Sequence, residues 1–210
     1  MGLIRRLLLP LPKKYSNESK VRKTNPGMAS NYADDILLLQ EFRDPATKEK
    51  AFTGIIKKYQ EKLYWHVRRI VIHHEDANDV LQNVFIKVWN GLGNFREDSQ
   101  LYTWLYRVAT NESLTYLEQQ KRKSSLSIDG EGNMVNQLKA DKDFDAGKIE
   151  WKLQMAIQQL PDKQRIVFNL RYYDEMPYEQ MSRVLDTSEG ALKASYHHAV
   201  KKIEDFILNH

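Results

Sequence analysis

The sequence predicts an all-α fold of two small helical domains joined by a flexible linker, with a helix-turn-helix in the C-terminal domain. Apolar residues recur at three- and four-residue spacing along most of the 210-residue chain, which is the period of amphipathic helices. No strand-like alternation of useful length interrupts this pattern. Residues 124–149 are polar, contain three glycines and show no clear apolar face, a composition typical of a linker.

Composition narrows the class of protein. The chain is 41% hydrophobic and contains no cysteine, which excludes disulfides, thiolate chemistry and cysteine-ligated zinc. Its apolar runs are too short to span a bilayer, so we expect no direct membrane insertion and a cytoplasmic location. The net charge of +4, a sequence pI near 9.0 and clustered Lys and Arg favour a polyanionic partner.

The N-terminal segment differs from the rest of the chain. Residues 1–27 carry seven Lys or Arg against one Glu and show no lasting periodicity, so we expect a basic disordered tail. Pro10 and Pro12 interrupt its leucine run before that run reaches the length of a signal-peptide core. Translation from Met28 is an alternative start, because this residue precedes the first helical pattern.

Residues 30–123 predict a domain of four helices. The first helix is short and leucine-rich, from Asp34 to Phe42. Asp44 and Pro45 offer a cap and a first-turn proline for a long second helix. The apolar stripe of this second helix comprises Phe52, Ile56, Tyr59, Leu63, Val67 and Ile70.

The third and fourth helices complete this domain. The third is expected from about Asp76 to Asn90, where Gly91 and Gly93 would end it. Its inward residues are Ala77, Leu81, Val84 and Val88. Ser99 is placed to cap the fourth helix. The apolar residues of the fourth helix are Leu101, Trp104, Leu105 and Val108. Its C-terminal end, residues 121–123, is basic.

The second domain, residues 150–208, begins with two further helices. Trp151, Leu153, Ile157 and Leu160 start the first of them, and Pro161 with Asp162 starts the next. The buried side of that next helix comprises Ile166, Val167, Leu170 and Tyr173.

A helix-turn-helix follows. Its first helix spans Pro177–Leu185, Asp186 and Thr187 form the turn, and Ser188 caps a helix that runs to Ile207. Asp tolerates a left-handed backbone better than most residues. The apolar stripe of the second helix is Leu192, Tyr196, Ala199, Ile203 and Phe206. The second helix of such a motif enters the DNA major groove, although many all-helical proteins contain similar pairs as plain packing.

Three stretches resemble the extracytoplasmic-function (ECF) sigma factors of bacterial RNA polymerase. They are DANDVLQNVFIKVW at 76–89, FREDSQLYTWLYRVATNESLTYLEQQKRK at 95–123 and LPDKQRIVFNLRYYDEMPYEQMSRVLDTSEGALKASYHHAVKKI at 160–203. The likeness covers roughly residues 30–207. Matches in two domains in the right order are more specific than a solitary helix-turn-helix.

The resemblance implies an initiation subunit, not an enzyme, that directs polymerase to promoters and helps to open them. Residues 30–123 would be sigma region 2 and residues 150–208 sigma region 4. Its partners would be RNA polymerase core enzyme, promoter DNA and a cognate anti-sigma factor. The promoter would be read as duplex at the minus-thirty-five element and as a single strand at the minus-ten element.

The polar face of the third predicted helix would, by the same resemblance, bind the polymerase core. The residues of this face are Asp79, Gln82, Asn83 and Lys87. The alternative is a solvated helix face without a partner, which is common in helical proteins.

The resemblance places minus-ten recognition on the turn before the fourth helix and on that helix. A base read on its Watson–Crick edge must leave the stack, so the site needs a pocket with apolar walls and polar groups. The candidates are Phe95, Arg96, Asp98, Ser99, Gln100, Arg107, Asn111, Lys121, Arg122 and Lys123. The basic members suit phosphates. For Phe95 and Trp104, a core position that supports the loop is favoured over base stacking.

The second helix of the helix-turn-helix would read the minus-thirty-five element. Lys193 can donate to guanine acceptors and Ala194 can contact a thymine methyl. The full candidate set is Ser188, Glu189, Lys193, Ala194, His197, His198 and Lys201. The family often carries more arginine here and a glycine in the turn, so the promoter sequence stays open.

The sequence gives little indication of metal binding, catalysis or cofactor binding. His73, His74, Glu75 and Asp76 are adjacent and point in different directions on a helix, so we assign no metal. No catalytic residue, phosphate loop or cofactor site is assigned. Two other classes remain as alternatives: a stand-alone helix-turn-helix regulator, which would bind DNA as a dimer, and an interaction protein that clamps a partner between two helical lobes.

Overall fold

The structure is a computed structural model that describes the backbone of residues 26–126 and 148–209, and the side chains of residues 33–123 and 152–209. Within these ranges the chain is helical and contains no strand, which confirms the all-α prediction. Most of the predicted tail and of the predicted linker lies outside the described residues.

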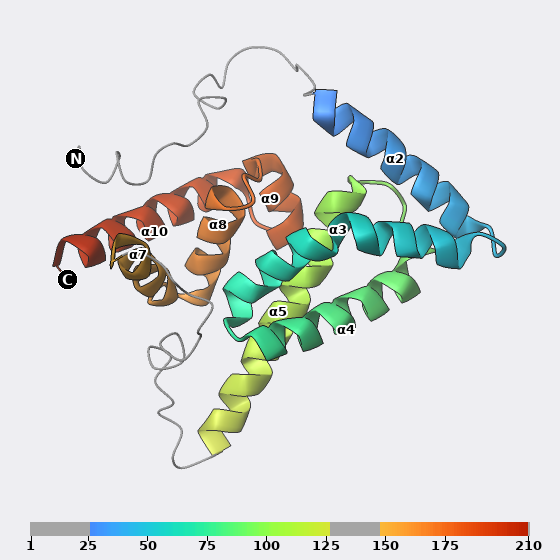
Figure 1. Cartoon of the computed structure of the whole chain (residues 1–210). Helices are drawn as coiled ribbons and strands as arrows, with labels where there is room; N and C mark the ends of the chain where they lie inside the picture. Colours follow the sequence, from blue (N-terminus) through green and yellow to red (C-terminus); the bar gives the residue numbers. More distant parts are fainter. Residues whose placement is uncertain (1–25, 127–147, 210) are drawn as a thin grey trace.

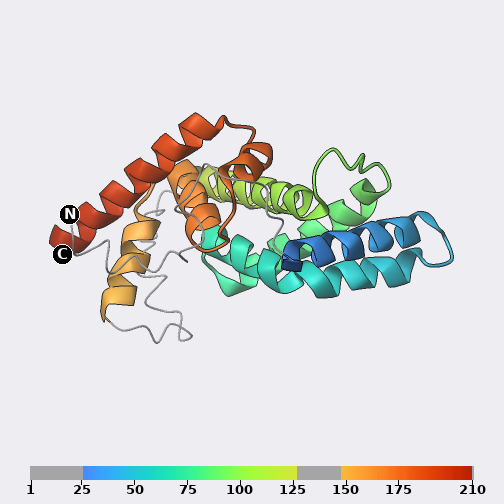
Figure 2. The same cartoon turned by 90° about the horizontal axis from the view of Figure 1, so that it is seen from above.

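The N-terminal domain consists of four helices with α3 at its centre (Figure 1). They are α2 (Pro26–Arg43), α3 (Lys48–Val71), α4 (His74–Leu92) and α5 (Leu101–Leu126). Helix α3 packs against the other three, and Figure 2 shows α2 and α3 side by side. The fully buried residues of α3 include Ile55, Leu63, His66, Val67 and Ile70. The predicted stripe is therefore mostly correct, although Phe52 and Ile56 are only half-buried.

The first two helices begin at other residues than predicted. Helix α2 starts at Pro26, where a proline fits the first turn, so the last two residues of the predicted tail are helical. Helix α3 starts at Lys48 because Asp44 accepts a hydrogen bond from the backbone N–H of Ala46 at 3.0 Å. This contact folds residues 44–47 into a turn, and the predicted cap at Asp44 is therefore wrong.

The ends of α4 and α5 also differ. Gly91 lies inside α4, and its missing Cβ leaves room for the Trp104 ring, which a Cβ would meet at 3.2 Å. Gly93 ends the helix with φ of −63°, so it does not use the left-handed backbone that glycine permits. Helix α5 continues to Leu126, past the predicted end at 123.

The C-terminal domain also has four helices in its described part. They are α7 (Lys148–Gln158), α8 (Asp162–Tyr172), α9 (Tyr178–Leu185) and α10 (Glu189–Asn209). Helix α10 packs on α7, α8 and α9. The C-terminal domain has a small hydrophobic core of its own, which consists of Ala156, Ile157, Leu160, Phe168, Ala199 and Ile203. This matches the predicted helix order.

The turn of the helix-turn-helix has the predicted geometry. Asp186 adopts a left-handed backbone with φ of 48° and ψ of 49°. Ser188 accepts a hydrogen bond from the backbone N–H of Ala191 at 3.3 Å, which satisfies one free donor of the first turn of α10. Thr187 donates its hydroxyl to the carbonyl of Leu185. The serine cap is confirmed.

The two domains pack against each other. Helix α9 lies beside α5 in both views (Figures 1 and 2), and α8 contacts α3. One hydrophobic cluster contains the core of the N-terminal domain together with Ile166, Val167, Leu170, Met176, Met181, Val184 and Leu192. The sequence predicted two lobes on a tether and did not predict this shared core.

Candidate nucleic-acid interface

A cavity of about 500 Å³ opens where α4 ends and α5 begins. The segment between these helices, residues 94–100, is called the reading loop below. Five predicted minus-ten residues line the cavity: Phe95, Arg96, Asp98, Ser99 and Arg107. Asn94, Thr103 and Trp104 contribute further walls. The cavity therefore combines aromatic surface with hydroxyl, amide, carboxylate and guanidinium groups, as a site for an unstacked base requires.

The aromatic rings of Phe95 and Trp104 pack against each other beside the reading loop. Phe95 is 8% exposed and its ring centroid lies 5.3 Å from that of Trp104. The backbone N–H of Phe95 donates to the carbonyl of Leu92 at 3.2 Å. Phe95 and Trp104 therefore support the loop, which is the role that the sequence favoured, and they also form part of the cavity wall.

The remaining predicted minus-ten residues lie outside the cavity. Asn111 is exposed on α5, one turn beyond Arg107, so both face the same side of the helix. Lys121, Arg122 and Lys123 are exposed near the end of the same helix, and Lys121 pairs with Asp162. A polar ridge thus leads from the cavity along α5. Its residues suit a nucleic-acid backbone that leaves the cavity.

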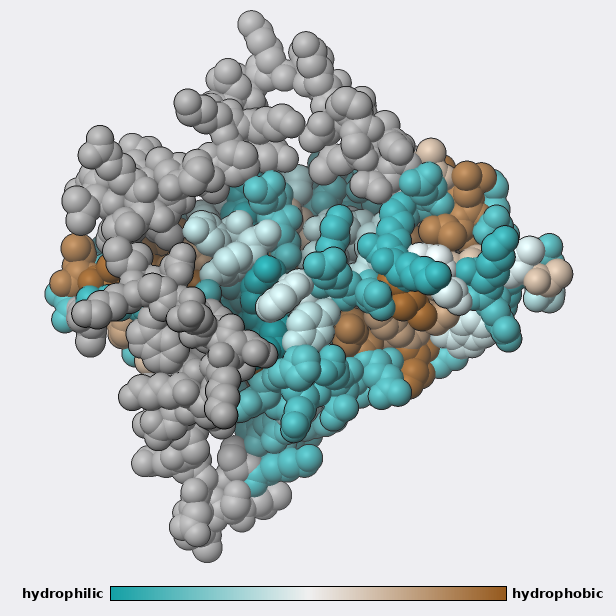
Figure 3. All heavy atoms as spheres, in the orientation of Figure 1, coloured by the Kyte–Doolittle hydropathy of each residue, from teal (hydrophilic) through white to brown (hydrophobic). Residues whose placement is uncertain are grey.

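The polar face of α4 is open. Its residues Asp79, Gln82, Asn83 and Lys87 are all exposed, and Figure 3 shows hydrophilic surface over α4 bordered by an apolar area toward α3. Lys87 pairs with Glu112 of α5. Ile86 is 53% exposed beside these polar groups. Ile86 is not among the residues predicted from the sequence, although its place off the apolar stripe indicates exposure.

The outer face of α10 carries the predicted upstream-reading residues. Ser188, Glu189, Lys193, Ala194, His197, His198 and Lys201 are exposed. Lys193 lies 3.7 Å from Glu189 one turn earlier and 5.6 Å from the ring centroid of Tyr178. These contacts hold the long side chain of Lys193 near the start of α10. This end of the recognition helix approaches base edges in such motifs.

His74 makes contacts that require no metal. Its Nδ1 lies 2.6 Å from the Tyr64 hydroxyl and its Nε2 lies 3.2 Å from the Asn78 side-chain amide. Among the described residues, no group of His, Asp and Glu is arranged to hold a metal ion. None of the helices in the described part of the chain has the length and apolar character needed to cross a bilayer.

Comparisons with known proteins match both domains. The model of sigma-70 region 2 matches residues 55–123, and that of sigma-70 region 4 matches residues 150–203. The RNA polymerase sigma-H factor of Pseudomonas aeruginosa is 30% identical over 165 residues, which cover 74% of this chain and 86% of that protein. The ECF RNA polymerase sigma-E factor of Escherichia coli K12 is 30% identical over 166 residues, 75% of this chain and 86% of that protein.

The chain belongs to the ECF sigma factors. Members of this family are DNA-binding transcription initiation factors. The prediction of a sigma factor is therefore confirmed, and the alternative of a stand-alone regulator is not favoured. The four helices of the N-terminal domain contain region 2, and α7–α10 contain region 4.

Two solved structures share the fold. CnrH in complex with the cytosolic domain of CnrY has a TM-score of 0.61 at 19% identity, over 83% of this chain and 97% of that one. The sigma factor RpoE of Bartonella quintana, in complex with the anti-sigma factor NepR, has a TM-score of 0.60 at 17% identity, over 75% of this chain and 97% of that one.

Proposed function

We propose that region 2 of this sigma factor, residues 30–123, reads the minus-ten element as a single strand at the cavity beside the reading loop. The observation that carries this proposal is the joint lining of one cavity by Arg96, Asp98, Ser99 and Arg107. Hydroxyl and carboxylate oxygens can accept from a flipped base, and guanidinium groups can donate to it or to its phosphate.

The strand leaves the cavity along α5. Asn111 lies one turn beyond Arg107 on the exposed side and offers both a donor and an acceptor to the next base. The basic cluster at 121–123 contacts phosphates further along. Region 2 thereby stabilises the melted strand after the duplex opens.

Region 4, residues 150–208, recognises the minus-thirty-five element as duplex. The N-terminal part of α10 presents Lys193, Ala194 and His197 to the major groove. Ser188 and Glu189 flank this surface, while His198 and Lys201 lie further along the helix and suit backbone contacts. One chain thereby reads both promoter elements.

The exposed face of α4 binds the core polymerase. Asp79, Gln82, Asn83 and Lys87 provide hydrogen bonds and charges, and the exposed Ile86 provides an apolar anchor. In this interface Ile86 would be the desolvated central contact and the polar residues around it the rim. The proposal makes this face an interface, whereas the alternative from sequence was a solvated helix side.

The protein acts in the cytoplasm and contributes no catalytic step of its own, because the chemistry of RNA synthesis belongs to the polymerase core. A cognate anti-sigma factor restrains it. The solved sigma factor RpoE of Bartonella quintana is in complex with such a protein, which supports this partner by analogy.

Reconstituted transcription tests the proposed function. The chain is mixed with core RNA polymerase and fragments of the source genome, and the 5′ ends of the transcripts are mapped. We expect a small set of start sites that core polymerase alone does not use. Binding of the isolated chain to duplex sites without any polymerase-dependent start would instead support a stand-alone regulator.

A further inference from the structure

The exposed face of α10 carries two adjacent histidines within a row of lysines. His197 and His198, called the histidine pair below, are both exposed, and their ring centroids lie 6.0 Å apart. Residues four positions apart share a helix face, so His197 lies between Lys193 and Lys201, and Lys202 follows His198 by one turn. Helix α10 runs along the outer side of region 4 in both views (Figures 1 and 2). The histidine pair therefore lies in the middle of an outward-facing basic stripe.

The histidine pair has no acidic partner on its own helix. Among the described residues, neither imidazole makes a hydrogen bond or an ion pair with another side chain, and the two rings contact each other. Glu189 lies 3.7 Å from Lys193 and so pairs with that lysine. The acidic residues 204–205 lie about 9 to 10 Å beyond His198 along the helix axis, at 1.5 Å per residue.

The helices that pack on α10 also leave the histidine pair without a carboxylate. Asp162 of α8 pairs with Lys121 and Arg165, and Glu179 of α9 pairs with Arg183. The described side chains of α7 include no acid, and the other charged side chains described on these three helices are basic. In the described part of the free chain, nothing of opposite charge therefore stabilises a protonated imidazole of the pair.

Position along α10 separates the two histidines. A recognition helix approaches base edges with its N-terminal part, and later residues of the helix suit the phosphate backbone. His198 lies about 8 Å beyond Lys193 along the axis. A neutral imidazole offers a phosphate one N–H donor, whereas an imidazolium offers a positive charge and releases a counterion on binding. The strength of a phosphate contact by His198 therefore depends on its charge.

We propose that His198 is a proton-dependent phosphate contact of region 4, so that recognition of the minus-thirty-five element tightens as the pH falls from 8 to 6. This inference rests on the proposed function of region 4 and adds regulation to it. Histidine changes its charge between about pH 5 and 8, whereas lysine stays charged throughout that range. A nearby phosphate favours the charged imidazole, so binding to DNA takes up a proton and lower pH favours the complex.

A pH series on the holoenzyme, the chain bound to core polymerase, tests the proposal. Its affinity for a mapped promoter duplex is measured at pH 6, 7 and 8 at one ionic strength, for wild type and for His198→Gln. The polymerase is the same in both samples, so the ratio of the two affinities removes its own pH dependence. We expect this ratio to rise at least about threefold from pH 8 to pH 6. A constant ratio would overturn the proposal.

Salt dependence tests whether a charge is responsible. At pH 6 the log–log salt slope of wild type should be steeper than that of His198→Gln by up to about 0.9, the value for one phosphate contact, and at pH 8 the two slopes should converge. Equal slopes at pH 6 would contradict a charged contact. Circular dichroism at each pH checks that both chains stay helical.

A permanently charged variant and a distant histidine serve as controls. His198→Arg carries its charge at every pH of the series, so its affinity relative to His198→Gln should stay constant. His74→Gln removes an exposed histidine of α4 that lies outside the proposed DNA surfaces, and it should keep the full wild-type gain at pH 6. A gain that persists in His198→Arg, or that disappears in His74→Gln, would place the proton on another group and overturn the proposal.

Two further comparisons separate this inference from the function on which it rests. His197→Gln should keep the gain at pH 6; loss of the gain in His197→Gln alone would overturn the assignment to His198. A competitor duplex with a scrambled minus-thirty-five element measures promoter preference. Equal binding of both duplexes at every pH would remove the proposed function of region 4, and the histidine contact with it. A preference that is kept without any pH-dependent difference from His198→Gln would leave that function standing and overturn only the histidine contact.

Discussion

Arg43, in the last turn of α2, lies 2.7 Å from Glu97 in the reading loop, with the guanidinium Nη2 facing Oε1 of the carboxylate. Glu97 has a positive φ of 60°, which a non-glycine residue adopts only when its surroundings hold it there. The ion pair is one such restraint. It connects the first described helix to the loop that lines the strand-reading cavity.

Arg43→Ala should therefore impair promoter opening more than stability. Both side chains are substantially exposed, at 55% and 39%, so loss of the pair is expected to cost below about 1 kcal/mol of unfolding free energy. Opening is measured as permanganate reactivity of thymines in the promoter bubble. The exchange Arg43→Glu with Glu97→Arg should restore opening. Loss of opening that persists in the exchanged chain would mean that the pair does not position the loop.

Polymerase docking predicts a second phenotype. The double variant Asp79→Ala and Gln82→Ala should bind core polymerase more weakly, because both side chains are exposed on the open face of α4, yet should unfold at the wild-type temperature. Ile86→Ala is expected to weaken binding in the same way. The measurement is a competition titration against wild type for core enzyme, with Glu118→Ala on α5 as control. Wild-type affinity in the folded double variant would exclude this face.

Much of this architecture was predictable from local pattern. The stripe that includes Leu63, Val67 and Ile70 predicted the buried side of α3, because helical period alone decides which residues share a face. Asp186 and Ser188 predicted the turn and the cap of α10 from their own backbone and hydrogen-bonding chemistry. Each of these signals is complete within a few residues of sequence.

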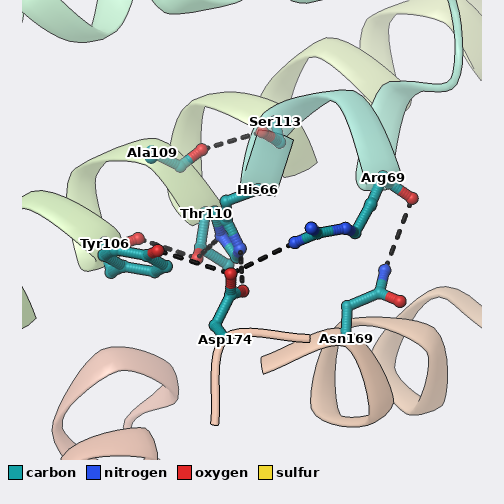
Figure 4. A network of polar contacts seen from close by, with 8 residues as sticks. All are labelled: His66, Arg69, Tyr106, Ala109, Thr110, Ser113, Asn169 and Asp174. Carbon is teal, nitrogen blue, oxygen red and sulfur yellow. Dashed lines mark hydrogen bonds and ion pairs between the residues drawn. The ribbon is translucent and has the colours of Figure 1, made fainter. Parts of the chain in front are cut away.

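The packing of the two domains against each other had no such local signal. Asp174 follows two tyrosines in what reads as an ordinary polar turn, and its partner His66 lies 108 positions away. His66 sits on the buried face of α3, where the sequence shows only a break in an apolar stripe. Nothing in either segment indicates the other, because the pairing of a carboxylate with a distant imidazole depends on how the two domains pack (Figure 4). The same holds for Arg183 of α9, which donates to the backbone carbonyl of Asp98 in the reading loop, because this contact arises only from the docking of α9.

The upstream contact predicts a change in sequence preference. Lys193→Ala should weaken binding to the minus-thirty-five element by about 1 to 3 kcal/mol if the ammonium contacts a guanine edge. Lys201→Ala should weaken binding more evenly across sequences and make its salt dependence shallower. Both are measured by competition between mapped promoter fragments at several salt concentrations. A uniform loss for Lys193→Ala would place this lysine on the phosphate backbone.

Strand reading predicts an effect that depends on the state of the DNA. Asn111→Ala should lower initiation on a promoter with a pre-melted bubble as well as on duplex, because the amide would contact the separated strand. Asp205→Ala, near the far end of α10, serves as control because it lies away from the cavity and from α5. If Asn111→Ala initiated normally on both templates, the ridge beyond the cavity would not read the strand.

Stability should fall at high pH through the tyrosine that lies beside the domain junction. Burial raises the pKa of Tyr102 to about 12, against a smaller lowering by its hydrogen bond with Tyr106. An unfolded tyrosine titrates near 10. Between these values the unfolded chain has lost the proton and the folded chain keeps it, so the free energy of unfolding decreases by about 1.4 kcal/mol per pH unit. Below pH 9 the contribution is fully present.

Tyr102→Phe removes this contribution, together with the effect of the Tyr102 hydroxyl on the pKa of Tyr106. Urea unfolding at pH 8, 9, 10, 11 and, where folding persists, 12 gives the free energy of unfolding of each. We expect the wild-type curve to fall more steeply above pH 10, so that the difference between the two proteins changes in favour of the variant as pH rises. Parallel curves from pH 9 to pH 11 would show that the Tyr102 hydroxyl titrates as it does in the unfolded chain, and that the side chain is not buried at the junction in solution.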